Sequence, residues 1–167
     1  VYPPGASVVV GFRRPDVAHP LDGFGVLIPA VEGFRVLGTL FSSSLFPNRA
    51  PAGDVTLTSY VGGMRQPDFA RQAPEAIIQL VFEDLRRLFG IKGSPTFQQC
   101  VVYSRAIPQY EVGYGRFKNL MNDMEGKAPG FFIAGHYRDG ISLGDSLVSG
   151  HQAADRIHAW LTQSEAK

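Results

Sequence analysis

The sequence has little of what several protein classes require. Cys100 is the single cysteine among 167 residues, so the chain forms no internal disulfide and no cysteine cluster for zinc. It has no run of about 18 apolar residues, and therefore no predicted membrane-spanning helix. Its 16 basic and 15 acidic residues are nearly balanced, which disfavours nucleic-acid binding because that function needs clustered positive charge.

Familiar site motifs are missing as well. Neither G-x-G-x-x-G nor G-x-x-x-x-G-K-[ST] occurs, so no dinucleotide or P-loop site is recognisable. No set of Ser, His and acid stands out for nucleophilic catalysis, and the histidines are too scattered to indicate a metal site. The chain also lacks an initiator Met and a signal peptide, and a strand pattern begins almost at once. We therefore expect a fragment of a longer protein.

What is present indicates a folded α+β chain, with 44% hydrophobic and 19% charged residues. Alternating or apolar runs with turn residues between them predict strands. The predicted strands are Val8–Phe12, Phe24–Pro29, Phe34–Ser43, Val55–Val61 and Phe97–Arg105. The short spacing of the first four favours an antiparallel sheet.

One amphipathic helix is predicted over Pro74–Phe89, where proline suits the first turn and Gly90 the stop. We expect it to cover the sheet. The same pattern places Glu83 and Asp84 on its solvated side. Cys100 is predicted to be a buried strand thiol, and Ser42–Ser44 the polar end of a strand.

The segment Pro129–Ile157 predicts a strand, a loop and a helix. Phe131–Ile133 suits a buried strand, and Ser146–Trp160 looks helical after a second short helix at 116–124. Glycines between them lie at positions 135, 140 and 144. A helix N-terminus after such a loop offers free N–H groups. From the residues alone, an ordinary connection and a cofactor site both remain open.

Five motifs resemble the protoporphyrinogen oxidases of the flavin-dependent amine oxidase superfamily. They are Pro20–Pro29, Leu37–Pro51, Tyr60–Gly63, Ala106–Tyr110 and Ala134–Asp155, in family order over nearly the whole chain. The resemblance implies the C-terminal part of such an enzyme. Residues 1–112 would be a portion of the substrate-binding domain, mainly antiparallel sheet with a covering helix. Residues 113–167 would be a strand–loop–helix return into the FAD-binding domain.

The resemblance also implies site residues. Pattern alone favours a core role for the apolar strand residues, but the family motifs imply that some line a tetrapyrrole cleft: Phe24, Gly25, Leu27, Leu40 and Tyr60. Those implied to contact the flavin are Tyr103, Gly135, Gly140, Ile141, Ser142 and Leu143. Backbone N–H groups of that loop are expected to support negative charge on the reduced flavin. No catalytic side chain and no metal are expected, and the basic residue that pairs with a substrate propionate is expected outside this chain.

The implied activity is oxidation of a porphyrinogen to a porphyrin by FAD and dioxygen, in heme or porphyrin biosynthesis. The isolated chain is expected to be inactive, without nucleic-acid partners, and to come from the cytoplasm or the periphery of the inner membrane. Membrane contact through a region outside the chain and a homodimer both stay open, as does protoporphyrinogen versus coproporphyrinogen. Two alternatives remain: another flavin oxidase of the amine oxidase type, and a non-catalytic paralogue that binds tetrapyrrole.

Overall fold

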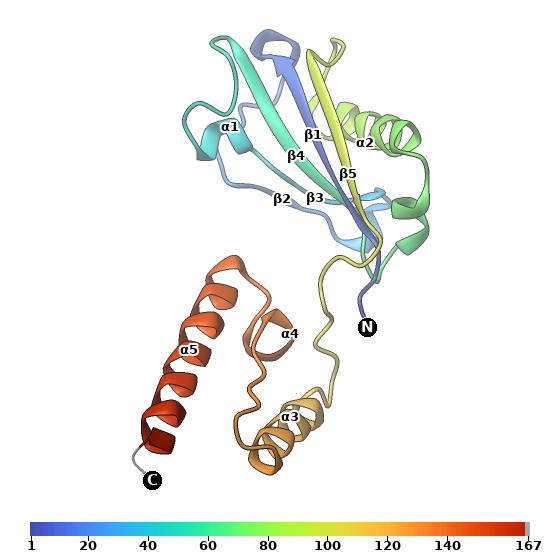
Figure 1. Cartoon of the computed structure of the whole chain (residues 1–167). Helices are drawn as coiled ribbons and strands as arrows, with labels where there is room; N and C mark the ends of the chain where they lie inside the picture. Colours follow the sequence, from blue (N-terminus) through green and yellow to red (C-terminus); the bar gives the residue numbers. More distant parts are fainter. Residues whose placement is uncertain (166–167) are drawn as a thin grey trace. The chain divides into compact units, whose positions relative to one another are not determined.

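The computed structural model describes residues 1–165, which form two compact units (Figure 1). One comprises residues 2–106, and the other comprises Val1 with the residues from 107 onward. The division falls before the expected boundary at 112/113. The N–H of Ala106 donates to the carbonyl of Pro3 at 2.9 Å, so the chain stays bonded to the sheet unit up to that point.

The first unit is built on five strands in the order β2-β3-β4-β1-β5. Their bounds are β1 Gly5–Arg13, β2 Gly25–Leu27, β3 Val36–Leu40, β4 Asp54–Gly62 and β5 Phe97–Tyr103. Every neighbouring pair is antiparallel, which confirms the expected antiparallel sheet and the α+β class. Three short 3-10 helices lie in the connections, at Arg14–Asp16, Ala30–Glu32 and Pro67–Arg71.

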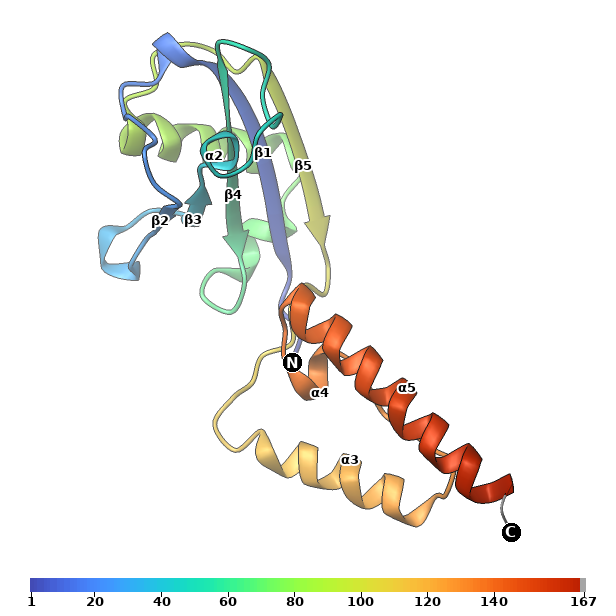
Figure 2. The ribbon, with the colours of Figure 1, turned by 90° about the vertical axis from the view of Figure 1, so that its left-hand side faces the viewer.

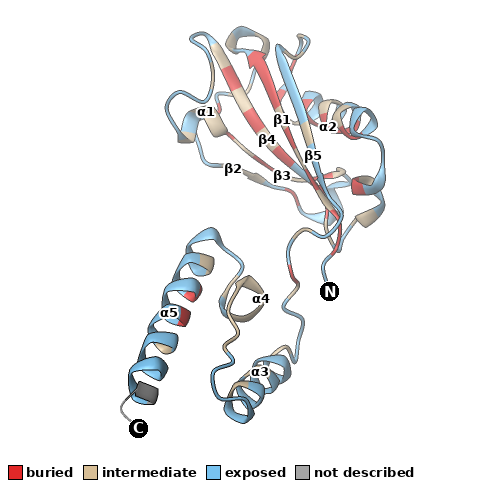
Figure 3. Ribbon diagram, in the orientation of Figure 1, coloured by how far each residue is buried: buried red, intermediate tan, exposed pale blue. Residues whose placement is uncertain are grey.

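Helix α2, Pro74–Phe89, has the bounds expected from its sequence and covers one face of the sheet (Figure 2). Gly90 ends it in a left-handed conformation with φ +62°, which glycine adopts at little cost. Alternate residues of β1 and β4 point into the same core. Figure 3 shows the buried residues of these strands in red. The core includes Val8, Val10, Phe12, Leu57, Val61, Ile77, Val81, Leu85 and Phe89.

A bulge in β3 sets which of its residues face α2. Val36 pairs with Val61, but the next pair is Gly38 with Tyr60, so β3 contains one extra residue there. Beyond the bulge, Thr39 is buried and hydrogen-bonds Ser59 on the covered face. Leu40, the residue after Thr39, therefore lies on the face that α2 does not cover.

The serines expected at a strand end instead form α1, Ser42–Leu45. Ser42 Oγ lies 2.7 Å from Thr58 Oγ1, and Ser43 Oγ accepts the N–H of Thr56 at 3.0 Å. The Ser43 hydroxyl thus bonds a backbone N–H of β4 in place of a neighbouring strand, and the Ser42 hydroxyl bonds a side chain of the same strand.

Asp84 also departs from expectation, because it is fully buried rather than solvated. Its carboxylate accepts the N–H groups of Arg35 at 2.7 Å and Val36 at 3.0 Å, and the Arg35 guanidinium at 2.8 Å. With a further bond from Arg35 Nε at 3.2 Å, four hydrogen bonds offset the cost of burying this charge. Glu83 remains half-exposed.

Cys100 lies in β5, as expected, but it is only partly buried. Burial raises the pKa of its thiol, with a smaller contribution from Glu75. The thiol is therefore held in its neutral, weakly nucleophilic form.

The second unit contains α3 Gly115–Lys127, α4 His136–Asp139 and α5 Leu143–Glu165. The expected strand at Phe131–Ile133 is wrong, because this segment is extended but pairs with no strand in the described chain. Side chains bond its backbone instead: Glu125 accepts the N–H of Ile133 at 2.6 Å. Among residues 1–165, no helix combines the length and apolarity needed to cross a bilayer.

Candidate functional site

The face of the sheet that α2 leaves uncovered, here called the open face, carries several of the predicted site residues. Leu27 pairs with Gly38, and Gly38 pairs with Tyr60. Directly paired residues share a face, so Leu27 and Tyr60 stand on the same side. Leu40 pairs with Thr58, two residues before Tyr60, and joins them because side chains two apart on a strand point the same way.

Tyr103 belongs to this face too. It pairs with Gly5, and Tyr60 pairs with Ser7, two residues further along the same strand. Both aromatic side chains are exposed, Tyr60 by 41% and Tyr103 by 50%. The Tyr60 hydroxyl has no hydrogen-bond partner among the described residues, so its ring is the part that the fold presents.

Gly38 shapes the open face between Leu27 and Tyr60. A Cβ at position 38 would lie 2.9 Å from Leu27 Cδ2, so the leucine side chain occupies the space above this glycine. Leu27 is nevertheless 90% exposed. Leu27 and Tyr60 thus form an apolar surface, and the residue between them, Gly38, has no side chain to separate them.

The other two predicted cleft residues differ in position. Gly25 pairs with Leu40 and so belongs to the open face, but a Cβ there would lie 2.2 Å from the carbonyl oxygen of Thr39, so glycine is needed for the close approach of β2 and β3. Phe24 precedes β2 and is 68% exposed, and the strand pairing does not place it on the open face. Its carbonyl accepts the N–H of Phe41 at 3.0 Å.

A groove of about 390 Å³ lies along the same face, between β1, β4, β5 and the loop before β4. Its lining includes Val9, Thr56 and Phe97, together with the cation of Arg49. Arg49 makes no ion pair within residues 1–165, and its guanidinium lies 5.6 Å from the centre of the Phe46 ring. The groove thus combines apolar walls with the Arg49 cation and with the Asp54 carboxylate, which accepts a hydrogen bond from Thr96 Oγ1 at 3.1 Å.

The remaining predicted residues lie in the second unit, around α4 and the start of α5. The N–H of Gly135 donates to Ser149 Oγ at 3.0 Å, and that hydroxyl donates to Asp139 Oδ2 at 2.7 Å. Gly135 has φ +133° and Gly140 has φ +134°, conformations that favour glycine. The loop is therefore held in a defined shape by its own chain.

Helix α5 begins at Leu143, three residues earlier than expected, because Ser142 and Asp145 form a capping box. The N–H of Asp145 donates to Ser142 Oγ at 3.0 Å, and the N–H of Ser142 donates to Asp145 Oδ2 at 3.2 Å. The N–H groups of Leu143 and Gly144 have no partner in the described part of the chain. Two polar donors are thus left at the helix start.

Apolar side chains flank these donors. Ile141 is 50% exposed and Leu143 is 79% exposed. Free N–H groups beside exposed aliphatic side chains suit a flat ring with a polar edge, which fits the isoalloxazine of a flavin. Ser142 has a structural role in the cap that is sufficient to explain it.

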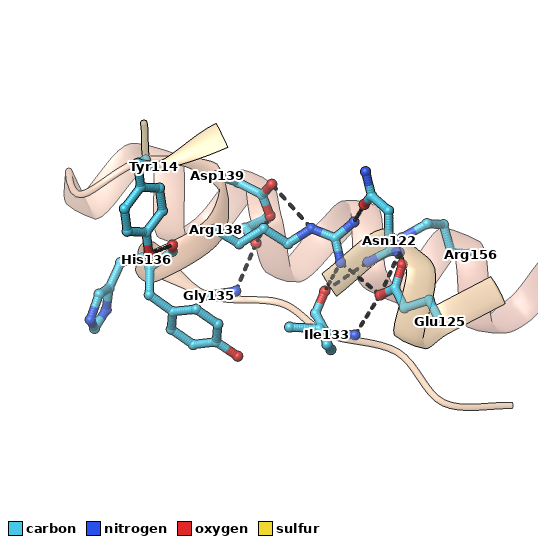
Figure 4. A network of polar contacts seen from close by, with 12 residues as sticks. Tyr114, Asn122, Glu125, Ile133, Gly135, His136, Arg138, Asp139 and Arg156 are labelled. Atoms are coloured by element: carbon cyan, nitrogen blue, oxygen red, sulfur yellow. Dashed lines mark hydrogen bonds and ion pairs between the residues drawn. The ribbon is translucent and has the colours of Figure 1, made fainter. Parts of the chain in front are cut away.

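A partly buried ionic network supports the loop (Figure 4). Arg138 donates to Glu125 Oε1 at 2.7 Å, Arg156 donates to Glu125 Oε2 at 2.8 Å, and both arginines donate to the carbonyl of Ile133. Burial alone would raise the pKa of Glu125, but the hydrogen bonds from Arg138, Ile133 and Arg156 outweigh it and lower the pKa to about 2. Glu125 is therefore a structural anion at neutral pH.

Comparisons with known proteins identify the family of this chain. The family model described as "Flavin containing amine oxidoreductase" matches residues 1–158. The chain belongs to this family. A flavin is the cofactor that membership implies.

Several relatives are named for porphyrinogen oxidation. The chain is 39% identical to "Protoporphyrinogen oxidase 2, chloroplastic/mitochondrial" of Arabidopsis thaliana, over 96% of the chain and 32% of that protein. It is 28% identical to "Coproporphyrinogen III oxidase" of Bacillus subtilis, over 93% of the chain and 33% of that protein. The chain therefore spans about a third of the length of the curated relatives it matches.

The fold is shared with a solved structure. A candidate protoporphyrinogen oxidase from Exiguobacterium sp. 255-15 superposes with a TM-score of 0.78 at 21% identity, covering 95% of this chain and 34% of that one. At this identity the likeness shows the fold alone.

Sequence reasoning missed several residues that shape the site. Glu125, Ser149 and Tyr110 act through contacts between segments distant in sequence. Tyr110 and Ser149 lie within motifs of the family resemblance, but nothing in those motifs predicted these contacts, and no motif includes Glu125. The capping box was detectable, because Ser142 and Asp145 have the S-x-x-D spacing that marks a helix start.

Proposed function

We propose that the protein containing this chain is an FAD-dependent oxidase that converts a porphyrinogen into a porphyrin, with dioxygen as the final oxidant. The open face would form one wall of the substrate cleft, and the start of α5 would contact the flavin. The bound flavin supplies the hydride-accepting chemistry. The residues of this chain would bind the porphyrinogen and the flavin and orient them toward each other.

The single observation that carries the substrate side is the shared open face. Leu27, Leu40 and Tyr60 come from three strands, yet the pairing brings them to one exposed apolar surface. A flat macrocycle is matched by aliphatic walls and an aromatic ring. Arg49 in the adjoining groove adds a positive charge that suits a carboxylate substituent.

The flavin side rests on the unused donors of Leu143 and Gly144. The N–H groups of Gly135, Gly140 and Ser142 are bonded within the chain, whereas those of Leu143 and Gly144, like that of Ile141, have no partner among the described residues and are available to a ligand. Preorganised donors stabilise negative charge without reorganisation. We propose that they face the pyrimidine edge of FAD.

The chain on its own is proposed to be inactive. It covers about a third of its relatives' length, and its open face supplies only one wall of a cleft. Activity is therefore to be sought in the full-length protein.

The deciding experiment is the visible absorption spectrum of the full-length protein in air, with protoporphyrinogen and separately with coproporphyrinogen. A flavin spectrum with a growing porphyrin band supports the proposal, and the faster substrate identifies the preferred porphyrinogen. A flavin spectrum without porphyrin formation would favour a related oxidase with another substrate. Absence of flavin in a protein that binds porphyrin would favour a non-catalytic paralogue.

Variants of Tyr60 test the open face directly. Tyr60→Ala removes the exposed ring, and we expect KM for the porphyrinogen to rise about tenfold, the equivalent of one good aromatic contact. Tyr60→Phe keeps the ring and should leave KM unchanged, because the hydroxyl has no partner within the described chain. Gln98→Ala, on the other side of β5, serves as the matched control.

A further inference from the structure

One tyrosine hydroxyl joins the two ends of α4. The N–H of Gly140 donates to Tyr110 Oη at 3.1 Å, and the Tyr110 hydroxyl in turn donates to the carbonyl of His136. These are the residues at the start of α4 and immediately after its end. A single oxygen therefore acts as both acceptor and donor for the turn.

The ring of Tyr110 is held in place by a second tyrosine. It stacks on Tyr114 with centroids 4.5 Å apart and planes at 24°. The Tyr114 hydroxyl donates to the carbonyl of Tyr137 at 2.5 Å, in the middle of the same turn. Stacking fixes where the Tyr110 hydroxyl can lie, so its two bonds to the loop are preorganised.

Tyr110 contributes little to a hydrophobic core, since it is 43% exposed. Its hydroxyl makes the specific contacts, with the carbonyl of His136 and the N–H of Gly140. Gly140 has φ +134° and no side chain to restrict it, so the bond to Tyr110 is what limits its rotation from outside the loop. The residues that follow, Ile141 and Leu143, are those proposed to lie against the flavin.

We propose that Tyr110 is a positioning residue for the flavin site. By holding Gly140, it fixes the orientation in which Ile141 and the free N–H groups of Leu143 and Gly144 meet the flavin. The inference rests on the proposed flavin contact at the start of α5. Tyr110 itself acts through the loop.

The test is Tyr110→Phe in the full-length protein, which keeps the ring stacking and removes only the hydroxyl. We expect hydrogen exchange in the peptide covering 136–142 to accelerate, and the Kd for FAD to rise about tenfold, as for the loss of one to two hydrogen bonds. The flavin midpoint potential should fall, because misplaced N–H donors support the reduced flavin less. A merely structural role would leave that potential unchanged in the molecules that retain flavin.

Tyr114→Phe is the matched control, because it removes a neighbouring hydroxyl without touching the Gly140 bond. It should change the potential less than Tyr110→Phe. Exchange in α2, which lies in the other unit, reports whether either variant folds. Unchanged potential and FAD affinity in Tyr110→Phe, or equal effects in the two variants, overturn the inference and leave the proposed function standing. A wild-type protein that holds no flavin overturns both.

Discussion

Different interactions stabilise the interior of each of the two units of this chain. Every member of the hydrophobic core cluster lies in residues 2–106, between the sheet and α2. In the described part of the other unit, the buried residues are only Pro108, Ser149 and Ala153. What fixes that unit is its set of hydrogen bonds and ion pairs, above all those of Glu125.

The difference teaches where shape is robust. Burial of apolar area is non-directional and does not depend on the protonation of side chains. The apolar core of the sheet unit should therefore keep its form over a wide pH range. Ionic contacts are directional and depend on protonation. The unit proposed to hold the flavin is therefore the one whose geometry responds to pH.

The largest expected effect breaks this comparison, because it removes a polar group from the apolar unit. Asp84→Ala leaves two backbone N–H groups without their acceptor and leaves the Arg35 guanidinium only its contact with the half-exposed Glu83. We expect the free energy of unfolding to fall by about 3–5 kcal/mol, the usual cost of removing one partner from a buried pair. Urea denaturation followed by circular dichroism measures it.

The adjacent residue provides the control. Glu83→Ala removes a carboxylate that also contacts Arg35 but is half-exposed, and surface pairs contribute little. If the two variants had equal midpoints, the buried carboxylate would not be what holds β3 to α2.

A smaller effect sharpens the comparison in the polar unit. The pKa of Glu125 is lowered from 4.5 to about 2 in the folded chain, so its contribution is complete above pH 4.5 and is lost as pH falls toward 2. Glu125→Gln should cost about 2 kcal/mol of local stability at neutral pH, because Arg138 and Arg156 lose a charged acceptor.

Hydrogen exchange of the peptide covering 131–142, measured from pH 7 downward, tests this. The wild type should loosen with acid, and Glu125→Gln should be loose throughout with a flatter pH response. A wild-type peptide that stays equally protected at pH 3 would show that the ionic network does not control the loop.

The smallest effect concerns the start of α5. Ser142→Ala removes the hydroxyl that accepts the N–H of Asp145, and we expect a loss of about 1 kcal/mol of helix stability. Faster exchange in the first turn of α5 is the measurement. Ser146→Ala, which removes only a hydroxyl donor to the Ser142 carbonyl, should have less effect.

Local patterns predicted the sheet unit well. Helix α2 has its expected ends because Pro74 and Gly90 mark both in the sequence itself. All five strands occur near their expected positions, since alternation is a property of neighbouring residues. The burial of Asp84 was not predicted, because its partners lie about fifty positions away in the chain.

The polar unit was less predictable for the same reason. The apolar run Phe131–Ile133 has the composition of a strand, but Glu125 and two arginines bond its backbone in place of a neighbouring strand. At the site, motif matching named Leu27, Leu40, Tyr60 and Tyr103 without predicting that one register brings them to one face. Their ligand contacts stay predictions.

The extra residue in β3 has a consequence for how this surface tolerates insertions and deletions. If every residue of β3 stayed in the ladder, Leu37 would pair with Tyr60, and Leu40 would turn inward opposite Leu57 while Thr39 turned outward. Deletion of Leu37 would instead remove the bulge and leave Gly38, Thr39 and Leu40 opposite their present partners, Tyr60, Ser59 and Thr58. The bulge therefore allows this strand to lose one residue at this point without exchanging the faces of Thr39 and Leu40.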